Sequence, residues 1–299
     1  MTNCFIVGCG YVGKKVALQE LKDGGKVSAL VSRLSSAQAL RSLGIDAIVC
    51  DLDSATLSPP DLSGSVLYWF APPPSKGLVD TRIASFFGSI AKSSLPSRLV
   101  LISTTGIYGD CRGAWVTESQ PARPTTDRAK RRVNAEEIAG HWCRQHGVPT
   151  VILRVPGIYG PGRLPVDRLR QNEPVLPIDQ SPWSNRIHVV DLVRACVASA
   201  TIEIDSLSNV PEICNVSDGS PSTTTEFYLS VAKFLGLPSP PILGEKVTSQ
   251  ILDSPTFSRS NDSKRVDNSR MREWLGVVPE FPCLELGLSA VGSPELIAS

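Results

Sequence analysis

The first thirteen residues constrain the fold more than any other part of the chain. A short apolar run at residues 4–7 leads directly into a Gly-x-Gly-x-x-Gly pattern at residues 8–13, and helical periodicity begins at Lys14. Gly8 permits a tight turn out of a strand, Gly10 lets the backbone approach a pyrophosphate, and Gly13 lets the helix pack closely on the strand. The first helical N–H groups would then point at the anion. The pattern predicts a dinucleotide site formed by Gly8, Gly10, Tyr11, Val12 and Gly13.

Strand and helix patterns alternate along the rest of the chain. Apolar runs predict strands at 26–31, 45–50, 66–70, 98–103, 148–155 and 212–216, and helical patterns include 35–43, 79–92, 191–200 and 226–235. This alternation is typical of a parallel, doubly wound sheet. We therefore expect an α/β fold of the Rossmann type. Its core would span residues 1–160 with a return at about 186–217, and residues 161–185 and 218–292 would form a small C-terminal substrate lobe.

Composition excludes several classes of partner. The 299 residues carry a net charge of +1, which argues against nucleic acid or an anionic membrane surface as a partner. No apolar stretch approaches the roughly 18 residues of a membrane helix. Because the first predicted strand begins almost at Met1, we expect no leader. The eight cysteines include no Cys-x-x-Cys pair, and five of them adjoin apolar runs: Cys4, Cys9, Cys50, Cys196 and Cys214. We expect free thiols in a cytoplasmic protein with no metal, rather than disulfides or a metal site.

The second and third strands end in residues suited to the adenosine half of a dinucleotide. Ser32 and Arg33 follow the second strand, where an acidic residue would bind the ribose of NAD and an arginine would accommodate the 2′-phosphate of NADP. The acid is missing, so NADP is the predicted cofactor and NAD is the alternative. Arg33 could instead be a solvated residue at a helix start. Asp51 and Leu52 follow the third strand, where the carboxylate would bind the adenine amino group or cap a loop.

The fourth and fifth strands end in residues suited to the nicotinamide half. Ala71 and Pro72 open a run of three prolines whose rigid backbone would form a wall beside the ribose and nicotinamide. The fifth strand ends in Ser103, Thr104 and Thr105. Because ligands sit beyond the carboxyl ends of such strands, these hydroxyls could bind a carbonyl or carbinol oxygen. The alternative interpretation is an ordinary turn rich in serine and threonine.

Four motifs in this order resemble the extended short-chain dehydrogenase/reductases, and the NAD-dependent epimerase/dehydratase group in particular. They are Gly-x-Gly-x-x-Gly, Leu-Ile-Ser-Thr-Thr-Gly-Ile-Tyr-Gly at 101–109, Leu-Arg-Val-Pro-Gly-Ile-Tyr-Gly-Pro-Gly at 153–162 and Arg-Ile-His-Val-Val-Asp-Leu at 186–192. The likeness covers about residues 2–215 and continues more weakly beyond. It implies that Thr104 touches the reacting oxygen, that Pro156 begins a loop over the nicotinamide, and that Arg186 contacts substrate.

The sequence departs from that group at its catalytic pair. The group carries Tyr-x-x-x-Lys followed by a Glu four residues later; if Glu136 is that Glu, Arg128 and Arg132 replace the Tyr and the Lys. The phenol acts there as a general acid/base, and the lysine lowers its pKa. Arginine has no acceptor and a pKa above about 12, so Arg128 cannot shuttle a proton, whereas Arg132 can retain the lysine's charge and its ribose bonds. The spacing places all three on one helix face toward the cofactor cleft, where two cations favour an anionic substrate.

Several residues remain candidates for the missing proton function and for substrate binding. Tyr108, Asp110, Glu118, Tyr159 and His188 are alternatives as acid/base, with a structural role the competing interpretation for Tyr108 and His188. The predicted substrate contacts are Thr105, Arg128, Tyr159, Arg163 and Arg186, although Arg163, Arg168 and Arg170 could also form a solvated basic face.

Three functions are compatible with these features. The first is an atypical NAD(P)-dependent oxidoreductase or epimerase/dehydratase-like enzyme for a small polar, anionic or sugar-like molecule. The second is an NADP(H)-binding redox sensor without turnover, which the absent Tyr and Lys favour. The third is a scaffold that uses the fold for oligomerisation. The resemblance also leaves a homodimer open, since related enzymes commonly pair helices.

Overall fold

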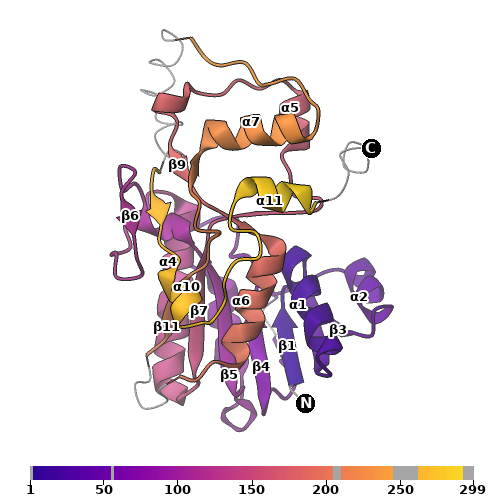
Figure 1. Cartoon of the computed structure of the whole chain (residues 1–299). Helices are drawn as coiled ribbons and strands as arrows, with labels where there is room; N and C mark the ends of the chain where they lie inside the picture. The colour runs from indigo at the N-terminus through magenta and orange to yellow at the C-terminus, as the bar shows by residue number, and fades with distance from the viewer. Residues whose placement is uncertain (1–2, 55–56, 205–209, 245–261, 292–299) are drawn as a thin grey trace.

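A seven-stranded parallel sheet forms the centre of the molecule in the computed structural model, which describes residues 3–54, 57–204, 210–244 and 262–291 (Figure 1). The strands are β1 (Asn3–Val7), β2 (Lys26–Val31), β3 (Asp46–Val49), β4 (Ser65–Trp69), β5 (Arg98–Thr104), β7 (Thr150–Val155) and β11 (Glu212–Asn215). Their order is β11-β7-β5-β4-β1-β2-β3, and it reverses beside β1. The predicted doubly wound α/β fold is confirmed, with its switch point between β1 and β4.

Helices cover both faces of the sheet because successive strand residues point to opposite sides. In β1, Cys4 and Ile6 join one apolar cluster while Phe5 and Val7 join the other. The first cluster includes residues of α1 (Tyr11–Lys22), α2 (Leu34–Arg41), α6 (Val189–Thr201) and α10 (Ser269–Glu273). The second includes residues of α3 (Thr81–Ser89) and α4 (Asp127–His146). Both faces are therefore buried, as the continuous apolar runs require.

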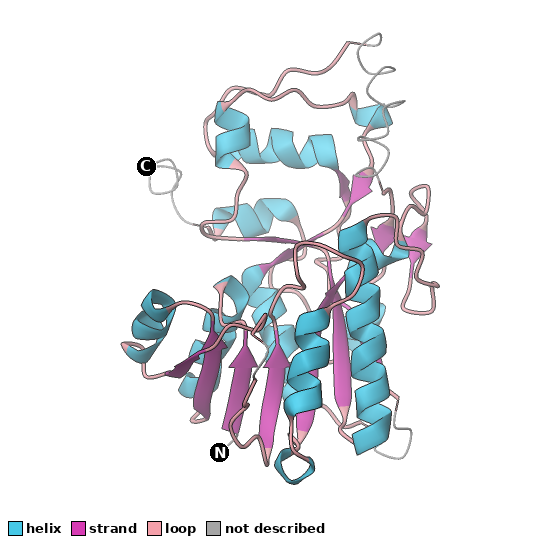
Figure 2. Cartoon of the chain, turned by 180° about the vertical axis from the view of Figure 1, so that it is seen from behind, coloured by secondary structure: helices cyan, strands magenta, loops and turns pink. Residues whose placement is uncertain are grey.

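A smaller lobe lies beyond the carboxyl ends of the strands (Figures 1 and 2). It contains α5 (Val166–Arg170), β9 (Trp183–Ser184), β12 (Ser222–Thr223), α7 (Thr224–Phe234) and α11 (Leu284–Ser289), with η3 (Ile178–Gln180) among them. Its apolar core joins Tyr159 to residues of α7 and α11, including Phe227, Val231 and Leu288. Two short parallel strands, β8 (Gly157–Tyr159) and β10 (Arg186–His188), lie between the sheet and this lobe.

Some segments differ from the sequence prediction. The helix expected at 79–92 divides into α3 and η1 (Lys92–Ser94), because Ile90 takes an extended backbone conformation. Part of the range predicted as lobe packs against the sheet. In the first apolar cluster, which also contains residues of α1 and α6, lie Met271, Leu275 and Val277. The chain is polar over residues 254–268, of which residues 254–261 lie outside the described ranges. The described part of that stretch, from residue 262, includes β13 (Arg265–Val266), which pairs with β6 (Trp115–Val116).

The eight cysteines are free thiols, as expected from the composition. Cys4, Cys9, Cys196 and Cys214 are buried free thiols, and burial raises the pKa of Cys9 and of Cys214 to about 12. These thiols are consequently protonated core residues at neutral pH. Within the described ranges, no helix combines the length and apolarity needed to cross a membrane.

Candidate functional site

The turn between β1 and α1 is shaped by its glycines. Gly8 has a φ of +89°, and a Cβ there would lie 2.4 Å from the backbone nitrogen of Ala71. A Cβ on Gly13 would lie 3.0 Å from the carbonyl oxygen of Gly8, so both positions require close backbone approach. A Cβ on Gly10 would meet nothing within 4 Å, and α1 begins there without a side-chain cap. The start of this helix thus faces open space with backbone N–H groups available to an anion.

That open space is a cavity of about 460 Å³, which we call the glycine-turn cavity. Its lining includes the residues of the turn (8–13), then Ser32, Arg33 and Ser36 beyond β2, and then Phe70, Pro72, Ile102, Arg132, Ile158 and Arg163. It begins at the helix N-terminus and extends along the carboxyl edge of β4 and β5. Its lining includes Arg33, Arg132 and Arg163, and these three cationic side chains fit an anionic ligand.

The residues that follow β2 line this cavity, whereas those that follow β3 do not. Ser32 and Arg33 line it and are exposed. Asp51 and Leu52 are absent from its lining, and the Asp51 Oδ1 atom accepts a hydrogen bond from the Asp53 backbone nitrogen at 3.0 Å. Ala71 lies buried behind Gly8, while Pro72 lines the cavity. Of the predicted cofactor contacts, the structure therefore places Arg33 in a position to meet a ligand and gives Asp51 a loop-capping bond.

Arg132 marks the far end of the glycine-turn cavity. Its Nη1 atom donates a hydrogen bond to the carbonyl oxygen of Ile102 at 3.2 Å. Burial lowers its pKa to about 10, and the carboxylate of Asp80 opposes that shift. Arg132 consequently stays charged at neutral pH, and one of its nitrogens is held against β5.

A second cavity, of about 360 Å³, adjoins the first, and we call it the Thr104 cavity. Five of its lining residues were predicted from the sequence: Thr104, Thr105, Arg128, Pro156 and Arg186. Other residues of its lining lie at the start of α4 or later in the chain: Thr126, Trp183, Ser184, Asn185, Asp262 and Lys264. The two cavities share neighbours along β5, α4 and β8, because Ile102, Arg132 and Ile158 line one while Thr104, Arg128 and Gly157 line the other.

Helix α4 presents its predicted face to this region. Arg128 lines the Thr104 cavity, and Arg132, one turn later, lines the glycine-turn cavity. Glu136 lies one further turn along and makes a buried ion pair with Arg154 of β7, with 2.8 Å between Oε2 and Nη2. The carboxylate is thus neutralised by the sheet rather than by the two arginines above it.

Polar residues at the end of β5 differ in their accessibility. The Thr104 Oγ1 atom accepts a hydrogen bond from the Gly106 backbone nitrogen at 3.2 Å, and its O–H remains able to donate into the cavity. Ser103 is buried, and its Oγ atom has no hydrogen-bond partner among the described residues. Tyr108 is fully buried; its hydroxyl donates to Asn215 Oδ1 at 2.7 Å and accepts from Arg154 Nη1 at 3.0 Å. Tyr108 therefore joins η2 (Thr105–Tyr108) to β7 and β11, and it lines neither cavity.

The other candidates for the proton function also have structural partners. The Glu118 Oε1 atom accepts from the Asn215 backbone nitrogen at 2.7 Å, and Asp110 Oδ1 accepts from the Ser263 backbone nitrogen at 3.0 Å. Tyr159 is buried in the lobe, and its hydroxyl donates to the Cys283 carbonyl oxygen at 3.4 Å. His188 is buried at the start of α6, where desolvation lowers its pKa. None of these four lines the Thr104 cavity.

The predicted substrate arginines separate in the structure. Arg186 lines the Thr104 cavity, with its guanidinium carbon 4.1 Å from the centre of the Phe227 ring. Arg163 lies in the glycine-turn cavity instead, 4.6 Å from the centre of the Tyr11 ring, whose hydroxyl donates to the Pro161 carbonyl oxygen at 2.9 Å. The loop after β8 is thus fastened to the glycine turn. Arg163 is positioned for the same ligand as Arg33, not for one near Thr104.

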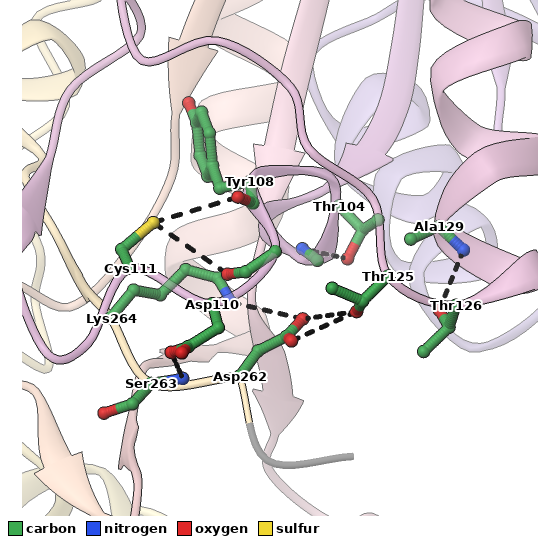
Figure 3. A network of polar contacts seen from close by, with 12 residues as sticks. Thr104, Tyr108, Asp110, Cys111, Thr125, Thr126, Ala129, Asp262, Ser263 and Lys264 are labelled. Carbon is green, nitrogen blue, oxygen red and sulfur yellow. Dashed lines mark hydrogen bonds and ion pairs between the residues drawn. The ribbon is translucent and has the colours of Figure 1, made fainter. Parts of the chain in front are cut away.

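Sequence reasoning missed the contribution of the C-terminal segment. Asp262 and Lys264 line the Thr104 cavity, and Thr125 Oγ1 donates to Asp262 Oδ1 at 3.1 Å (Figure 3). These residues lie in a polar stretch without helical or strand periodicity, so no local pattern marks them. They are brought to the cavity by long-range backbone pairing between β13 and β6.

Comparison with known proteins supports the family resemblance. Residues 87–216 match the model of the NAD dependent epimerase/dehydratase family. Protein YeeZ of Escherichia coli strain K12 is 26% identical, with 94% of this chain and 97% of YeeZ covered. A conserved protein of unknown function from Silicibacter pomeroyi DSS has a TM-score of 0.82 at 27% identity, covering 97% and 98% of the two chains. A UDP-glucuronic acid 4-epimerase from Bacillus cereus, solved with NAD, has a TM-score of 0.77 at 18% identity, covering 99% and 98%.

Proposed function

We propose that this chain, which has the fold and a matching segment of the NAD-dependent epimerase/dehydratase family, is an atypical NAD(P)-dependent oxidoreductase for a small anionic substrate. The observation that carries the proposal is the pair of adjoining cavities at the carboxyl edge of the sheet. One begins at an uncapped helix N-terminus and the other contains Thr104. A coenzyme in the first would bring its reactive end toward a substrate in the second.

The residues of the glycine-turn cavity fit a dinucleotide. Its pyrophosphate would meet the N–H groups at the start of α1, where Gly10 leaves the room that a Cβ would occupy. Arg33, with Ser32 and Ser36 beside it, would bind a 2′-phosphate, which favours NADP over NAD. Arg132 would bond a ribose at the opposite end. When bound, the nicotinamide supplies or accepts a hydride.

The Thr104 cavity favours an anionic substrate. Among the described residues, three cationic side chains, Arg128, Arg186 and Lys264, line it together with one carboxylate, that of Asp262. The stacking of Arg186 on Phe227 fixes one of the three in place, which reduces the entropy lost when it binds a carboxylate or phosphate. Thr104 can donate its hydroxyl proton to a substrate oxygen. Structural neighbours include proteins solved with UDP-glucose or UDP-glucuronic acid, and a sugar-like anion is therefore within the proposed class.

Coenzyme titration of a Gly10→Ala variant tests the proposal. A methyl group there has room in the folded protein but occupies the space assigned to the pyrophosphate. We expect affinity for NADPH to fall at least about tenfold, equivalent to about 1.4 kcal/mol, with an unchanged melting temperature. Gly88→Ala is the matched control, because its added methyl group also meets nothing within 4 Å and Gly88 lies on α3. A wild-type protein that binds neither NADPH nor NADH in calorimetry would contradict the proposed function.

A second candidate is a coenzyme-binding regulator without turnover. Arg128 at the position of the catalytic phenol favours it, because a guanidinium cannot exchange protons at neutral pH. The two candidates differ in whether NADPH is consumed when small oxo acids or sugar-like anions are supplied. For either candidate function, we also propose a cytoplasmic location and a homodimer.

A further inference from the structure

We propose that Lys264 exchanges the proton with the substrate oxygen in the Thr104 cavity, in place of the phenol that the chain lacks. The inference rests on the proposed function, since it assigns a residue to the reaction proposed there. It starts from a simple requirement. Reduction of a carbonyl needs a proton donor at the oxygen, and neither Arg128 nor Arg132 can supply one.

Lys264 is held in the cavity by its backbone. Its N–H donates to the Trp183 carbonyl oxygen at 3.4 Å, and its own carbonyl oxygen accepts from Asn185 Nδ2 at 3.0 Å. The Asn185 Oδ1 atom in turn accepts from the Val266 backbone nitrogen at 2.7 Å. One buried amide therefore clamps the chain on both sides of Arg265. Such fixation is what a group that must meet a reacting atom requires.

The preceding residue adds a second clamp. The Ser263 backbone nitrogen donates to Asp110 Oδ1 at 3.0 Å, and its carbonyl oxygen accepts from the backbone nitrogens of Cys111 and Gly113 at 3.0 and 2.9 Å. The loop after Tyr108 and the C-terminal segment thereby hold each other in place (Figure 3). The backbone from which the Lys264 side chain extends is therefore fixed in position.

The ammonium of Lys264 lies among groups that set its proton affinity. Its Nζ atom is 3.7 Å from Asp262 Oδ2, and the side chain is 7% exposed. Burial lowers the pKa of Lys264 from 10.5, and the negative charge of Asp262 is the largest opposing influence. Asp110 and Cys111 also face it and raise the pKa, while Arg128 and Arg186 line the same cavity. A lowered pKa brings the amine toward the range in which it can both give and take a proton.

Other titratable groups are less suited to this role. The hydroxyl of Tyr108 is engaged by Asn215 and Arg154, and the Glu118 carboxylate by a backbone N–H. Thr104 can orient an oxygen but does not ionise near neutral pH. Among the described residues that line the Thr104 cavity, the ionisable ones are Arg128, Arg186, Asp262 and Lys264. Asp262 is acceptor-only when ionised and is already bonded to Thr125, which leaves Lys264.

The step balances in protons and electrons. In the reducing direction, the substrate carbonyl carbon takes up a hydride from reduced coenzyme while its oxygen takes the proton that leaves Lys264 Nζ. The carbonyl becomes an alcohol, the coenzyme is oxidised, and the neutral amine regains a proton from solvent. In the oxidising direction the neutral amine accepts the hydroxyl proton, and the charge of Asp262 stabilises the ammonium that forms.

The first experiment measures the ionisation of Lys264 in the purified full chain without coenzyme. Trace acetic anhydride is applied at a series of pH values, and acetylation of each lysine is followed by mass spectrometry of peptides. We expect the midpoint for Lys264 to lie at lower pH than that for Lys76, which is exposed and lines neither cavity. The Asp262→Asn variant should shift the Lys264 midpoint further down, because it removes the negative charge that favours the ammonium.

A matched substitution controls for general charge effects. Asp127→Asn removes the exposed partner of Lys130, whose Nζ atom lies 3.8 Å from Asp127 Oδ1, and it should leave the Lys264 midpoint in place. A Lys264 midpoint equal to or above that of Lys76, or no labelling of Lys264 at any pH, would overturn the proposal. The first result would mean an ordinary ammonium, and the second an amine sealed away from the cavity.

The second experiment asks whether the amine meets a carbonyl held in the cavity. Glyoxylate, a small anionic carbonyl compound, is added with cyanoborohydride, which reduces any imine to a stable adduct. We expect the adduct at Lys264 to exceed that at Lys76, and Arg128→Gln to diminish it by removing a cation for the carboxylate. Adducts confined to exposed lysines would overturn the proposal. Both experiments omit coenzyme, so a failure of coenzyme binding would contradict the proposed function alone.

Discussion

Arg132 Nη1 donates to the Ile102 carbonyl oxygen across 3.2 Å and thereby joins α4 to β5 at the boundary between the two cavities. This bond leaves most of the guanidinium donors for a ligand and fixes the direction in which they point.

Arg132→Ala should weaken NADPH binding by about tenfold or more, because a charge-assisted hydrogen bond contributes about 1.5–3 kcal/mol. Arg132→Lys should retain part of that affinity, since it keeps the charge but not the planar fork. Arg128→Ala is the matched control one turn away, and it should leave coenzyme affinity unchanged because it lines the other cavity. Fluorescence titration of bound NADPH distinguishes the three variants. Equal affinities in all of them would show that this helix face does not meet the coenzyme.

Arg33 should make NADPH bind more tightly than NADH. Its guanidinium lines the glycine-turn cavity beside Ser32 and Ser36, where a 2′-phosphate would lie. Arg33→Ala should narrow the difference between the two coenzymes by about tenfold, and the effect should shrink at high salt because the site is exposed. Lys92→Ala removes a positive charge in η1 and serves as the control. Equal calorimetric affinities of the wild-type protein for both coenzymes would contradict this assignment.

Asp218 should make the protein less stable as pH rises through the weakly acidic range. Burial raises the pKa of its carboxyl from 3.8 to about 7, against the favourable charge of Arg186. The folded state therefore binds a proton that the unfolded state has already lost between these values. The associated stabilisation is complete below about pH 4 and disappears as pH rises through about 7.

Asp218→Asn should remove this pH dependence, because an amide cannot ionise and can still accept the bond from the Ser220 backbone nitrogen. Melting temperatures of the two proteins, measured from mildly acidic to neutral pH, should converge at the acidic end. At neutral pH the wild-type protein should melt at a lower temperature than the variant. The difference in unfolding free energy should be on the order of a few kcal/mol. Asp127→Asn, at an exposed position, should follow the wild-type curve. Parallel curves for the wild-type protein and Asp218→Asn would exclude Asp218 as the source.

Glu136→Gln should destabilise the fold by about 3–5 kcal/mol, because it leaves Arg154 as a buried charge without its carboxylate. Urea unfolding of the variant and of Glu137→Gln provides the comparison. Glu137 is the neighbouring residue on the exposed side of α4. A loss of coenzyme binding without a loss of stability would indicate that Glu136 acts on the ligand instead of on the sheet.

The parallel sheet was predictable because its signals are local. Apolar runs, glycine turns and helix patterns each depend on a few adjacent residues, and their alternation along the chain predicts a doubly wound parallel sheet. The face of α4 was predictable for the same reason, since Arg128 and Arg132 are one helical turn apart. These predictions needed no knowledge of which residues meet across the sheet.

The Thr104 cavity was only half predictable because its lining is assembled from distant segments. Tyr108 and Tyr159 belong to motifs in which other residues line the cavity. The Tyr108 hydroxyl nevertheless bonds to Asn215, and Tyr159 packs in the apolar core of the lobe. Lys264 has no local pattern, and its position depends on Asn185 and on the pairing of β13 with β6. A sequence shows such a residue only as one lysine among many.

The pairing of β13 with β6 has a consequence for the order in which the molecule matures. During synthesis, all seven strands of the central sheet have left the ribosome once Asn215 has emerged, so a nucleotide pocket could exist early. The lining of the Thr104 cavity is incomplete until residues 262–266 have been synthesised and have paired with the loop after Tyr108. A nascent chain would thus acquire the capacity to hold a coenzyme before it acquires the capacity to use one.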